Sequence, residues 1–261
     1  MSQEYAAPVI VAYGAGTNST ALLVGLHERG ERPDLILFAD TGGERPETYA
    51  YLDVMDEWLA RVGFPTLGRV RYTMKDGTVQ TLEERSLRTR SLPSIAYGYK
   101  ACSEKWKRRP QDKFVNNWEP AKAAWAAGLK CVKLIGYDAD EDRRVRNAPT
   151  EDAKYTYRYP LYDWDWDRNA CLDAIARAGL PSSGKSACFF CPSSKKTEIL
   201  DLKRRHPDLF ARACAMEANA DLDTIKGLGR RWSWSELADL ERSQTRLLPD
   251  PEETPCGCFD G

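Results

Sequence analysis

The chain has 261 residues, of which 42% are hydrophobic and 30% are charged. This composition supports one sizeable core, or one core with a small appendage, and it excludes collagen-like, intrinsically disordered and small disulfide-stapled proteins. The 38 Lys and Arg against 39 Asp and Glu give a net charge of -1. No global positive field therefore draws the protein onto nucleic acid or membrane, and any polyanion site must be local.

The first part of the chain alternates between buried-strand and helical patterns. Strands are predicted at 9–13, 35–39 and 69–74, and helices at 19–29 and 46–61. Strands that alternate with helices in this way are typical of a parallel sheet covered on both faces.

The middle of the chain is less regular, and the character of the sequence changes near residue 180. Helices are predicted at about 80–90, 111–118, 121–127 and 168–178, the last with Asp167 as N-cap, and a strand at 131–135 before a polar stretch, 136–157. We predict an α/β domain with a doubly wound, mostly parallel sheet over residues 1–180. A helical, cysteine-bearing region is expected over residues 181–261.

The apolar segments and the cysteines give an expectation of location. The chain begins without a basic segment followed by an apolar run, so no signal peptide is predicted. No stretch approaches the ~18 apolar residues of a membrane span. We expect a cytoplasmic protein without a membrane partner, in which close thiol pairs more often bind metal or do redox chemistry than form disulfides.

A glycine-bearing turn follows the first predicted strand. Gly14 and Gly16 allow close backbone approach, while Ser19 and Thr20 supply hydroxyl groups. A turn into a helix N-terminus offers N–H groups and a positive dipole end to phosphate. An ordinary tight turn explains the glycines equally well, since the loop matches neither a Walker A loop nor a GxGxxG motif.

Two of the chain's cysteine pairs are tight: Cys188/Cys191 and Cys256/Cys258. The CxxC spacing lets both sulfurs reach one metal ion or cluster from a single turn. Together with Cys102 and one thiol of the terminal pair, taken as Cys258, they would complete a four-thiolate site for either zinc or an iron–sulfur cluster. Three further cysteines in apolar or helical contexts are expected to pack in the core: Cys131, Cys171 and Cys214.

A basic stretch lies in the middle of the chain. Residues 85–109 hold eight Lys and Arg against one carboxylate, Glu104, and include Tyr97, Tyr99 and Trp106. Basic residues with aromatics suit a polynucleotide substrate. A solvated charged face with core aromatics is an equally good explanation of this composition.

Several motifs together resemble a known family. The loop Gly14-Ala-Gly-Thr-Asn-Ser-Thr20 resembles the Ser-Gly-Gly-Lys-Asp-Ser-Thr pyrophosphate loop of the adenine-nucleotide α-hydrolase superfamily, in particular its phosphoadenosine-phosphosulfate (PAPS) reductase-like family. Four further segments resemble family motifs in the same order: Phe38–Gly42 with Pro46–Thr48, Cys102-x4-Lys107-x2-Pro110, Gly136–Arg144 and Tyr159–Trp164. The resemblance extends from about residue 9 to residue 192.

The resemblance implies ATP and Mg²⁺ as cofactors and a set of site residues. Nucleotide contacts are expected from Tyr13, Gly14, Ala15, Gly16, Thr17, Asn18, Ser19, Thr20, Asp40, Thr41 and Gly136. Ser19 is expected to be catalytic, Arg143 and Arg144 to clamp developing phosphoryl charge, and Asp40 to contact metal or ribose. Because relatives carry a [4Fe–4S] cluster on a similar cysteine arrangement, the cluster is favoured over zinc at Cys102, Cys188, Cys191 and Cys258.

The sequence also departs from the family pattern. Thr17 and Asn18 replace the Lys-Asp of the ATP pyrophosphatases, which removes one cation and one carboxylate. The terminal Glu-Cys-Gly-x-His of the reductases is replaced by a segment with Cys256 and Cys258 and no histidine. Sulfite-forming reduction is therefore disfavoured.

The predicted function is ATP-dependent sulfur transfer to a nucleic acid, of the DNA phosphorothioation or tRNA thiolation type, with AMP and pyrophosphate as products. Cys256 and Cys258 are expected to be catalytic, a cysteine desulfurase to donate sulfur, and the chain to form a homodimer. Two alternatives stay open. One is a PAPS or adenylyl-sulfate reductase, and the other is a non-hydrolysing nucleotide- or nucleic-acid-binding protein with a structural zinc.

Overall fold

The computed structural model describes residues 7–99 and 101–243. Its strands form one sheet, in which every neighbouring pair is parallel, in the order β3-β2-β1-β4-β5. The strands are β1 (Val9–Tyr13), β2 (Leu35–Asp40), β3 (Leu67–Arg71), β4 (Cys131–Ile135) and β5 (Tyr155–Arg158). The predicted α/β fold with a parallel sheet is confirmed.

The α-helices are α1 (Thr17–Glu28), α2 (Pro46–Arg61), α3 (Leu82–Arg88), α4 (Ala101–Ser103), α5 (Arg109–Val115), α6 (Glu119–Ala126), α7 (Asp142–Arg146), α8 (Pro160–Asp163), α9 (Arg168–Arg177), α10 (Lys196–Arg205), α11 (Pro207–Asn219) and α12 (Trp234–Ser243). Short 3₁₀ turns, η1 (Ser94–Tyr97) and η3 (Ala139–Glu141), and one π-helical turn, η2 (Glu104–Arg108), complete the order.

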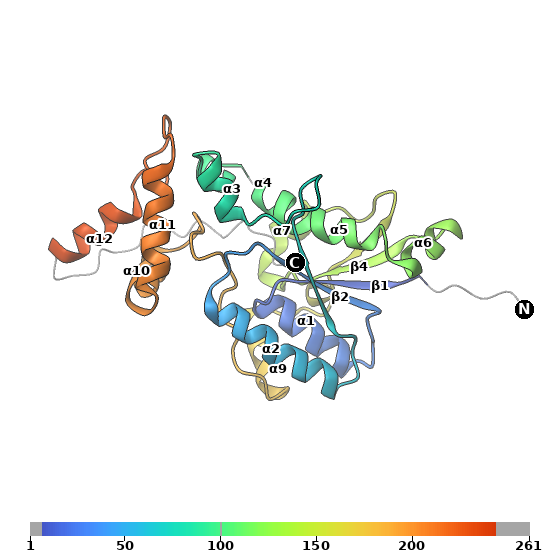
Figure 1. The fold of residues 1–261 in the computed structure, drawn as a ribbon. Helices are drawn as coiled ribbons and strands as arrows, with labels where there is room; N and C mark the ends of the chain where they lie inside the picture. The colour runs from blue at the N-terminus through green and yellow to red at the C-terminus, as the bar shows by residue number, and fades with distance from the viewer. Residues whose placement is uncertain (1–6, 100, 244–261) are drawn as a thin grey trace, which may run out of the picture.

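Helices cover both faces of the sheet, with α1, α2 and α9 on one side and α5 and α6 on the other (Figure 1). Because successive side chains of a strand point to opposite faces, β2 serves both layers. Ile36 and Phe38 pack against α1, α2 and α9, whereas Leu37 and Ala39 pack on the side of α5 and α6. The doubly wound arrangement predicted from the sequence is confirmed.

The connections from β1 to β2 and from β4 to β5 run toward opposite edges of the sheet, because β2 and β3 lie on one side of β1 and β4 and β5 on the other. The carboxyl ends of β1 and β4 therefore form a topological switch point, the place where open α/β sheets bind ligands. The loops after these two strands hold most of the predicted nucleotide contacts.

Some predicted boundaries are wrong. β3 runs over Leu67–Arg71 and not over 69–74, because Leu67 pairs with Ile36 and the chain turns back after the strand, with Thr73 bridged to Val79. β5, in the stretch predicted only as polar, was missed. Its residues carry no run of apolar side chains, and the strand exists through its pairing with β4.

A second apolar cluster joins the helices after residue 180 to the middle of the chain. Leu82 and Trp106 share it with Phe190, Met216 and side chains of α10, α11 and α12. The three last helices stand beside the sheet, next to α3 (Figure 1).

A buried carboxylate organises the loop before α12. Glu217 is 6% exposed and accepts hydrogen bonds from the N–H groups of Leu228 and Trp234. Burial raises the pKa of Glu217, and these backbone donors oppose the rise. Within the part of the chain that the structure describes, no helix has the length and apolar character needed to cross a membrane.

Candidate functional site

The loop after β1 forms a closed turn into α1. Ala15 adopts a left-handed conformation with φ of 59°, and Gly16 is the N-cap of the helix. The Ser19 hydroxyl donates to the Gly16 carbonyl and accepts from the Gly16 N–H, at 3.2 Å in both cases. Ser19, predicted to be catalytic, thus holds the loop together, while the first N–H groups of α1 lie at the carboxyl edge of the sheet.

Other side chains fix the base of the loop and cover it. Tyr13 Oη and Thr20 Oγ1 lie 3.2 Å apart, and burial raises the pKa of Tyr13 well above its ordinary value. Thr17 is 2% exposed because residues before the CxxC pair lie over it. The Thr17 hydroxyl lies 3.5 Å from that of Ser183 and donates to the Gly184 carbonyl at 3.5 Å. This cover connects the predicted phosphate loop to the cysteine-bearing region.

Asn18, which stands in place of the family's Asp, is held by side chains from distant parts of the sequence. Its Nδ2 donates to Asp138 Oδ2 at 2.9 Å and to Glu141 Oε2 at 3.0 Å, and its Oδ1 accepts from Arg168 Nη1 at 3.0 Å. An amide suits this position, because its NH₂ group meets two carboxylates and its oxygen meets a guanidinium. The substitution is therefore matched by its surroundings.

Asp138 has a buried oxygen available beside this loop. The side chain is 4% exposed, and Oδ1 has no hydrogen-bond partner among the described residues. Burial raises the pKa of the Asp138 carboxyl, while the hydrogen bond from Asn18 opposes the rise. Mg²⁺ in nucleotide sites takes one or two carboxylates together with phosphates, so Asp138, with Glu141 as its neighbour, fits a Mg²⁺ ion better than the predicted Asp40 does.

Three of these residues were not singled out as site residues. Asp138 could have been found, because it follows a predicted strand by three positions and therefore lies at the carboxyl edge. Glu141 lies in the same acidic run. Arg168 carries no such signal, since it is 150 residues from Asn18 in sequence.

Asp40 ends β2 and is already engaged by protein donors. Its Oδ1 accepts from the Gly42 N–H and from Tyr49 Oη, both at 2.8 Å, and its Oδ2 accepts from Arg71 Nε at 2.7 Å. The carboxylate therefore fixes the turn after β2. Its contact with metal or ribose stays a prediction.

Gly136 follows β4 and packs directly on the phosphate loop. A Cβ at this position would lie 3.0 Å from the backbone C and O of Asn18 and 3.1 Å from the backbone N of Ser19. Backbone atoms cannot rotate away as the end of a side chain can. A glycine therefore allows the close approach of the loops after β1 and β4, whereas a Cβ would require the backbone of Asn18 and Ser19 to shift by a few tenths of an ångström.

The two predicted clamp arginines lie differently. Arg144 forms an ion pair with Glu141 and places its guanidinium carbon 4.2 Å from the centroid of the Tyr137 ring. Since Glu141 also accepts from Asn18, Arg144 is connected to the loop through one carboxylate. Arg143 is exposed on α7.

Thr41 brings the CxxC pair to the same edge of the sheet. Cys188 Sγ lies 3.1 Å from Thr41 Oγ1, and the Phe189 N–H donates to the Gly43 carbonyl at 2.8 Å. The first thiol of the pair therefore lies at the carboxyl end of β2, one strand away from the loop after β1. Cys191 is buried, and its N–H donates to the Cys188 carbonyl at 3.0 Å.

A buried carboxylate lies beside the Cys188 thiol. Glu44 is 3% exposed, and its Oε1 accepts from Thr41 Oγ1 at 3.3 Å and lies 3.7 Å from Lys107 Nζ and 4.0 Å from Cys188 Sγ. Burial, followed by the Glu44 charge, raises the pKa of the Cys188 thiol well above its ordinary value, and Lys107 opposes the rise. Nothing in the local sequence pattern marked Glu44.

The described cysteines do not by themselves form a metal site. Within residues 7–99 and 101–243, no group of three or more His, Cys, Asp or Glu side chains lies together so that it could hold a metal ion. Cys102 and Cys188 are half-buried and both pack against the second apolar cluster. Cys256 and Cys258, predicted to be catalytic and to complete the ligand set, lie outside the described residues.

The remaining cysteines behave as packing residues. Cys131 and Cys171 are 0% exposed, as predicted, and burial raises the pKa of Cys171 to about 12. Cys214 is half-buried beside the second apolar cluster, and burial raises its pKa to about 11.

Comparisons with known proteins find similarity to a solved structure but no match among family models or curated proteins. No protein-family model matches the sequence. No curated protein matches it either. Among solved structures, the chain is similar to the U34-tRNA thiolase NcsA from Methanococcus maripaludis with its [4Fe–4S] cluster, at 13% sequence identity and a TM-score of 0.43, over 94% of this chain and 83% of that chain. No residue role in this chain follows from that similarity.

Proposed function

We propose that this protein uses ATP to transfer sulfur to a nucleic-acid acceptor, either a tRNA base or a DNA phosphate. An acceptor oxygen attacks the α-phosphorus of ATP, pyrophosphate leaves, and the acceptor is adenylated. The terminal sulfur of a cysteine persulfide then attacks the adenylated atom, and AMP leaves with the acceptor oxygen. A second thiol attacks the carrier sulfur, the S–S bond to the product sulfur breaks, and an external thiol reduces the disulfide that forms. The sulfur is supplied by a cysteine desulfurase, and the chain acts as a homodimer.

The position of Cys188 carries the proposal. Its thiol lies 3.1 Å from the Thr41 hydroxyl at the end of β2, and the phosphate loop follows the neighbouring strand β1. Because parallel strands end at one edge of a sheet, the Cys188 sulfur and a phosphate bound at the loop after β1 would lie on the same side of the molecule. Sulfur transfer through adenylation needs these two groups beside one acceptor.

The charges around the phosphate loop support nucleotide binding despite the missing Lys-Asp. Arg168 and Arg144 provide positive charge next to Asn18 and Glu141. The orphaned Asp138 oxygen would hold Mg²⁺, which neutralises phosphate charge when it is bound. Glycines and the N-terminus of α1 supply backbone donors. The positive charge and the carboxylate that the family's Lys-Asp would provide in the loop are thus provided by other segments of the chain.

The proposal includes a cysteine-ligated centre, and the support for this centre is the spacing of the cysteines in the sequence. Iron and zinc content, together with visible absorbance of anaerobically purified full-length protein, distinguish a [4Fe–4S] cluster from zinc. Iron with broad visible absorbance favours the cluster. Zinc without such absorbance favours a structural site, and the absence of both metals contradicts a centre at the cysteines.

Replacement of Cys188 by Ser is expected to abolish formation of the sulfur-bearing product while AMP and pyrophosphate still form. The reagents are ATP, Mg²⁺, a sulfur donor and either tRNA or DNA, and the products are followed by mass spectrometry of the digested nucleic acid. Cys214→Ser is the matched control, because this half-buried thiol lies in α11. Unchanged product from Cys188→Ser would contradict the role of this thiol.

Two other outcomes of the same assay favour other functions. Release of sulfite from PAPS in the presence of thioredoxin would support a reductase. Binding of ATP without any AMP would support a non-hydrolysing binding protein.

Gly136→Ala tests the nucleotide site. The added Cβ must displace the backbone of Asn18 and Ser19, so we expect a stability loss of about 1–3 kcal/mol and clearly weaker ATP binding by calorimetry. Gly68→Ala on β3 is the control, since its Cβ would lie 2.8 Å from the end of the Leu37 side chain and 3.3 Å from the backbone O of Ile36, both on β2 and outside the loop after β1. Equal ATP affinity in both variants would place the nucleotide elsewhere.

A further inference from the structure

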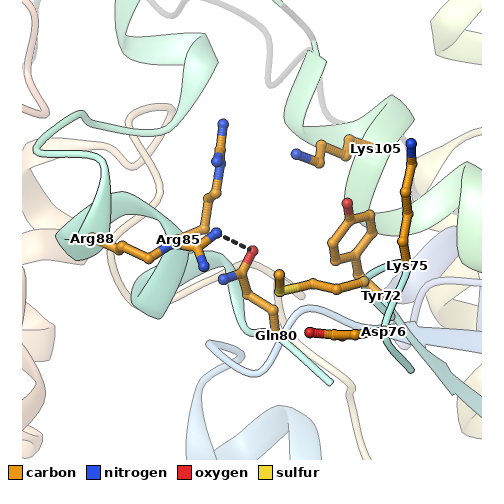
Figure 2. A pocket seen from close by; sticks show the side chains of 8 residues that line it. Tyr72, Lys75, Asp76, Gln80, Arg85, Arg88 and Lys105 are labelled. Atoms are coloured by element: carbon orange, nitrogen blue, oxygen red, sulfur yellow. Dashed lines mark hydrogen bonds between the residues drawn. The ribbon is translucent and has the colours of Figure 1, made fainter. Parts of the chain in front are cut away.

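A basic pocket of about 320 Å³ lies just beyond the end of β3, outside the nucleotide loop. Arg85, Arg88, Lys105 and Lys75 line it. Figure 2 shows Arg85 and Arg88 on α3 at one side, with Arg88 extending to Gln80, and Lys105 and Lys75 at the other side. Three neighbouring segments of the stretch 75–105 therefore bring four cations to one small space. Lys75 lies outside the basic stretch predicted from the sequence.

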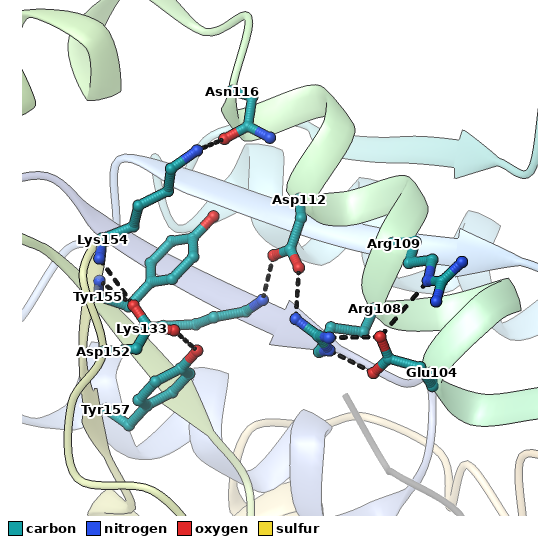
Figure 3. Close-up of polar contacts among 10 residues, drawn as sticks. All are labelled: Glu104, Arg108, Arg109, Asp112, Asn116, Lys133, Asp152, Lys154, Tyr155 and Tyr157. Carbon is teal, nitrogen blue, oxygen red and sulfur yellow. Dashed lines mark hydrogen bonds and ion pairs between the residues drawn. The ribbon is translucent and has the colours of Figure 1, made fainter. Parts of the chain in front are cut away.

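The cations of this pocket differ from the other basic residues nearby, because those are neutralised. Arg90 pairs with Asp221, and Lys107 lies near Glu44. Arg108 and Arg109 both pair with Glu104, and Arg108 also with Asp112, as Figure 3 shows. These side chains stabilise the fold through their ion pairs, and they do not form a free positive surface for binding a polyanion.

The four pocket cations have no such partners. Within residues 7–99 and 101–243, none of Lys75, Arg85, Arg88 and Lys105 forms an ion pair with a carboxylate. The one carboxylate that lines the pocket, Asp76, accepts from the N–H and hydroxyl of Thr78 at 2.9 and 2.7 Å, within its own turn. The Asp76 pKa is lowered first by the Thr78 hydrogen bonds and also by the charge of Arg88, so this one carboxylate offsets part of the positive charge. Four cations against one carboxylate still leave a positive pocket that favours a bound anion.

The pocket also offers an aromatic surface. Tyr72 is half-buried, its ring centroid lies 4.6 Å from that of Trp106, and Lys105 Nζ lies 5.0 Å from the Tyr72 centroid. Arg88 Nη2 donates to Gln80 Oε1 at 3.4 Å, which orients the guanidinium (Figure 2). An aromatic ring beside phosphate-binding cations is the combination that holds single-stranded nucleic acid.

The pocket is joined to the thiol site through one loop. The first N–H of α3, that of Leu82, donates to the Thr41 carbonyl at 3.0 Å, and the Thr41 hydroxyl lies 3.1 Å from Cys188 Sγ. The helix that carries Arg85 and Arg88 is therefore fixed to the same loop as the thiol. An acceptor strand held in the pocket would lie on the thiol side of the sheet edge.

We propose that the pocket binds one nucleotide unit of a single-stranded acceptor, with its phosphate on Arg85, Arg88 and Lys105 and its base against Tyr72. The inference rests on the proposed function in one respect, namely that the acceptor is a nucleic acid. A volume of about 320 Å³ suits a single unit, since sites for small ligands begin at about 300 Å³. The rest of the strand lies outside the pocket.

Binding of a fluorescent oligonucleotide of about eight residues to the full-length chain tests the proposal without ATP. Arg85→Ala/Arg88→Ala is expected to weaken binding about tenfold or more and to lower the slope of log affinity against log salt by about 0.7, the value for the one phosphate contact that the pocket provides. Tyr72→Ala is expected to weaken binding at least about fivefold with an unchanged slope, because stacking is not ionic. If these residues only stabilised the fold, the arginine variant and the Tyr72 variant would not differ in the salt dependence of binding.

Arg61→Ala/Arg158→Ala is the matched control, since it removes two exposed cations, from α2 and β5, that lie outside the pocket. Equal loss in the control and the pocket variant would overturn the proposal, as would tight binding of inorganic phosphate or free mononucleotides without binding of the oligonucleotide. If Arg85→Ala/Arg88→Ala fails to fold, Lys75→Ala/Lys105→Ala gives the same comparison. Absence of AMP formation with intact oligonucleotide binding would contradict the proposed function and leave the pocket assignment standing.

Discussion

Asn18→Asp is expected to lower the free energy of unfolding by about 3 kcal/mol at about pH 8, although it restores the residue of the resembling family. The new carboxylate would meet Asp138 and Glu141, which now accept hydrogen bonds from the amide at 2.9 and 3.0 Å. Arg168 compensates for part of this repulsion, because it donates to the other oxygen. Urea unfolding in Mg²⁺-free buffer measures the effect.

The loss is expected to shrink as pH falls. Like charges and burial raise the folded pKa values of the carboxyl groups at this position, and burial already raises that of Asp138. The folded variant therefore binds more protons than the unfolded chain, and its stability decreases as pH rises through the folded pKa. Asn18→Ala loses the same hydrogen bonds without adding charge. If the difference in free energy of unfolding between Asn18→Asp and Asn18→Ala does not depend on pH, the contacts of residue 18 with Asp138 and Glu141 are contradicted.

Asp112→Ala is expected to cost about 3–5 kcal/mol, because it leaves the Lys133 ammonium buried without its carboxylate. Lys133 in β4 is 4% exposed, and its Nζ lies 3.3 Å from Asp112 Oδ1 (Figure 3). Burial lowers the pKa of Lys133, and Asp112 opposes that decrease. Without Asp112 the folded state favours neutral lysine, so the loss should shrink as pH rises.

Two variants make this measurement decisive. Lys133→Met combined with Asp112→Ala removes both charges and should recover most of the stability, since apolar replacement of a buried pair is often neutral. Glu119→Ala breaks the exposed pair with Lys122 and should cost less than about 0.5 kcal/mol. Similar losses for Asp112→Ala and Glu119→Ala would show that Lys133 does not depend on Asp112.

Patterns within single segments predicted much of the fold. The short apolar runs at Val9–Tyr13 and Cys131–Ile135 gave strands with the predicted bounds, and Asp167 caps α9 through a 2.7 Å hydrogen bond to the Ala170 N–H. These features succeed because they depend on neighbours in sequence. β5 was missed because its hydrogen bonds come from β4, more than twenty residues before it.

The sequence by itself determined the α/β class, the glycine-bearing loop after β1 and the presence of a CxxC pair. Only the tertiary structure decided which polar residues meet at the site. Asn18 acquires its partners from residues 138, 141 and 168, and Cys188 acquires Thr41 and Glu44. The tertiary structure also shows that Arg108 and Arg109 form ion pairs with Glu104, whereas the four pocket cations form none with a carboxylate of the described residues. Hydrogen bonding and charge neutralisation act over a few ångströms in space, whereas the sequence orders residues only along the chain.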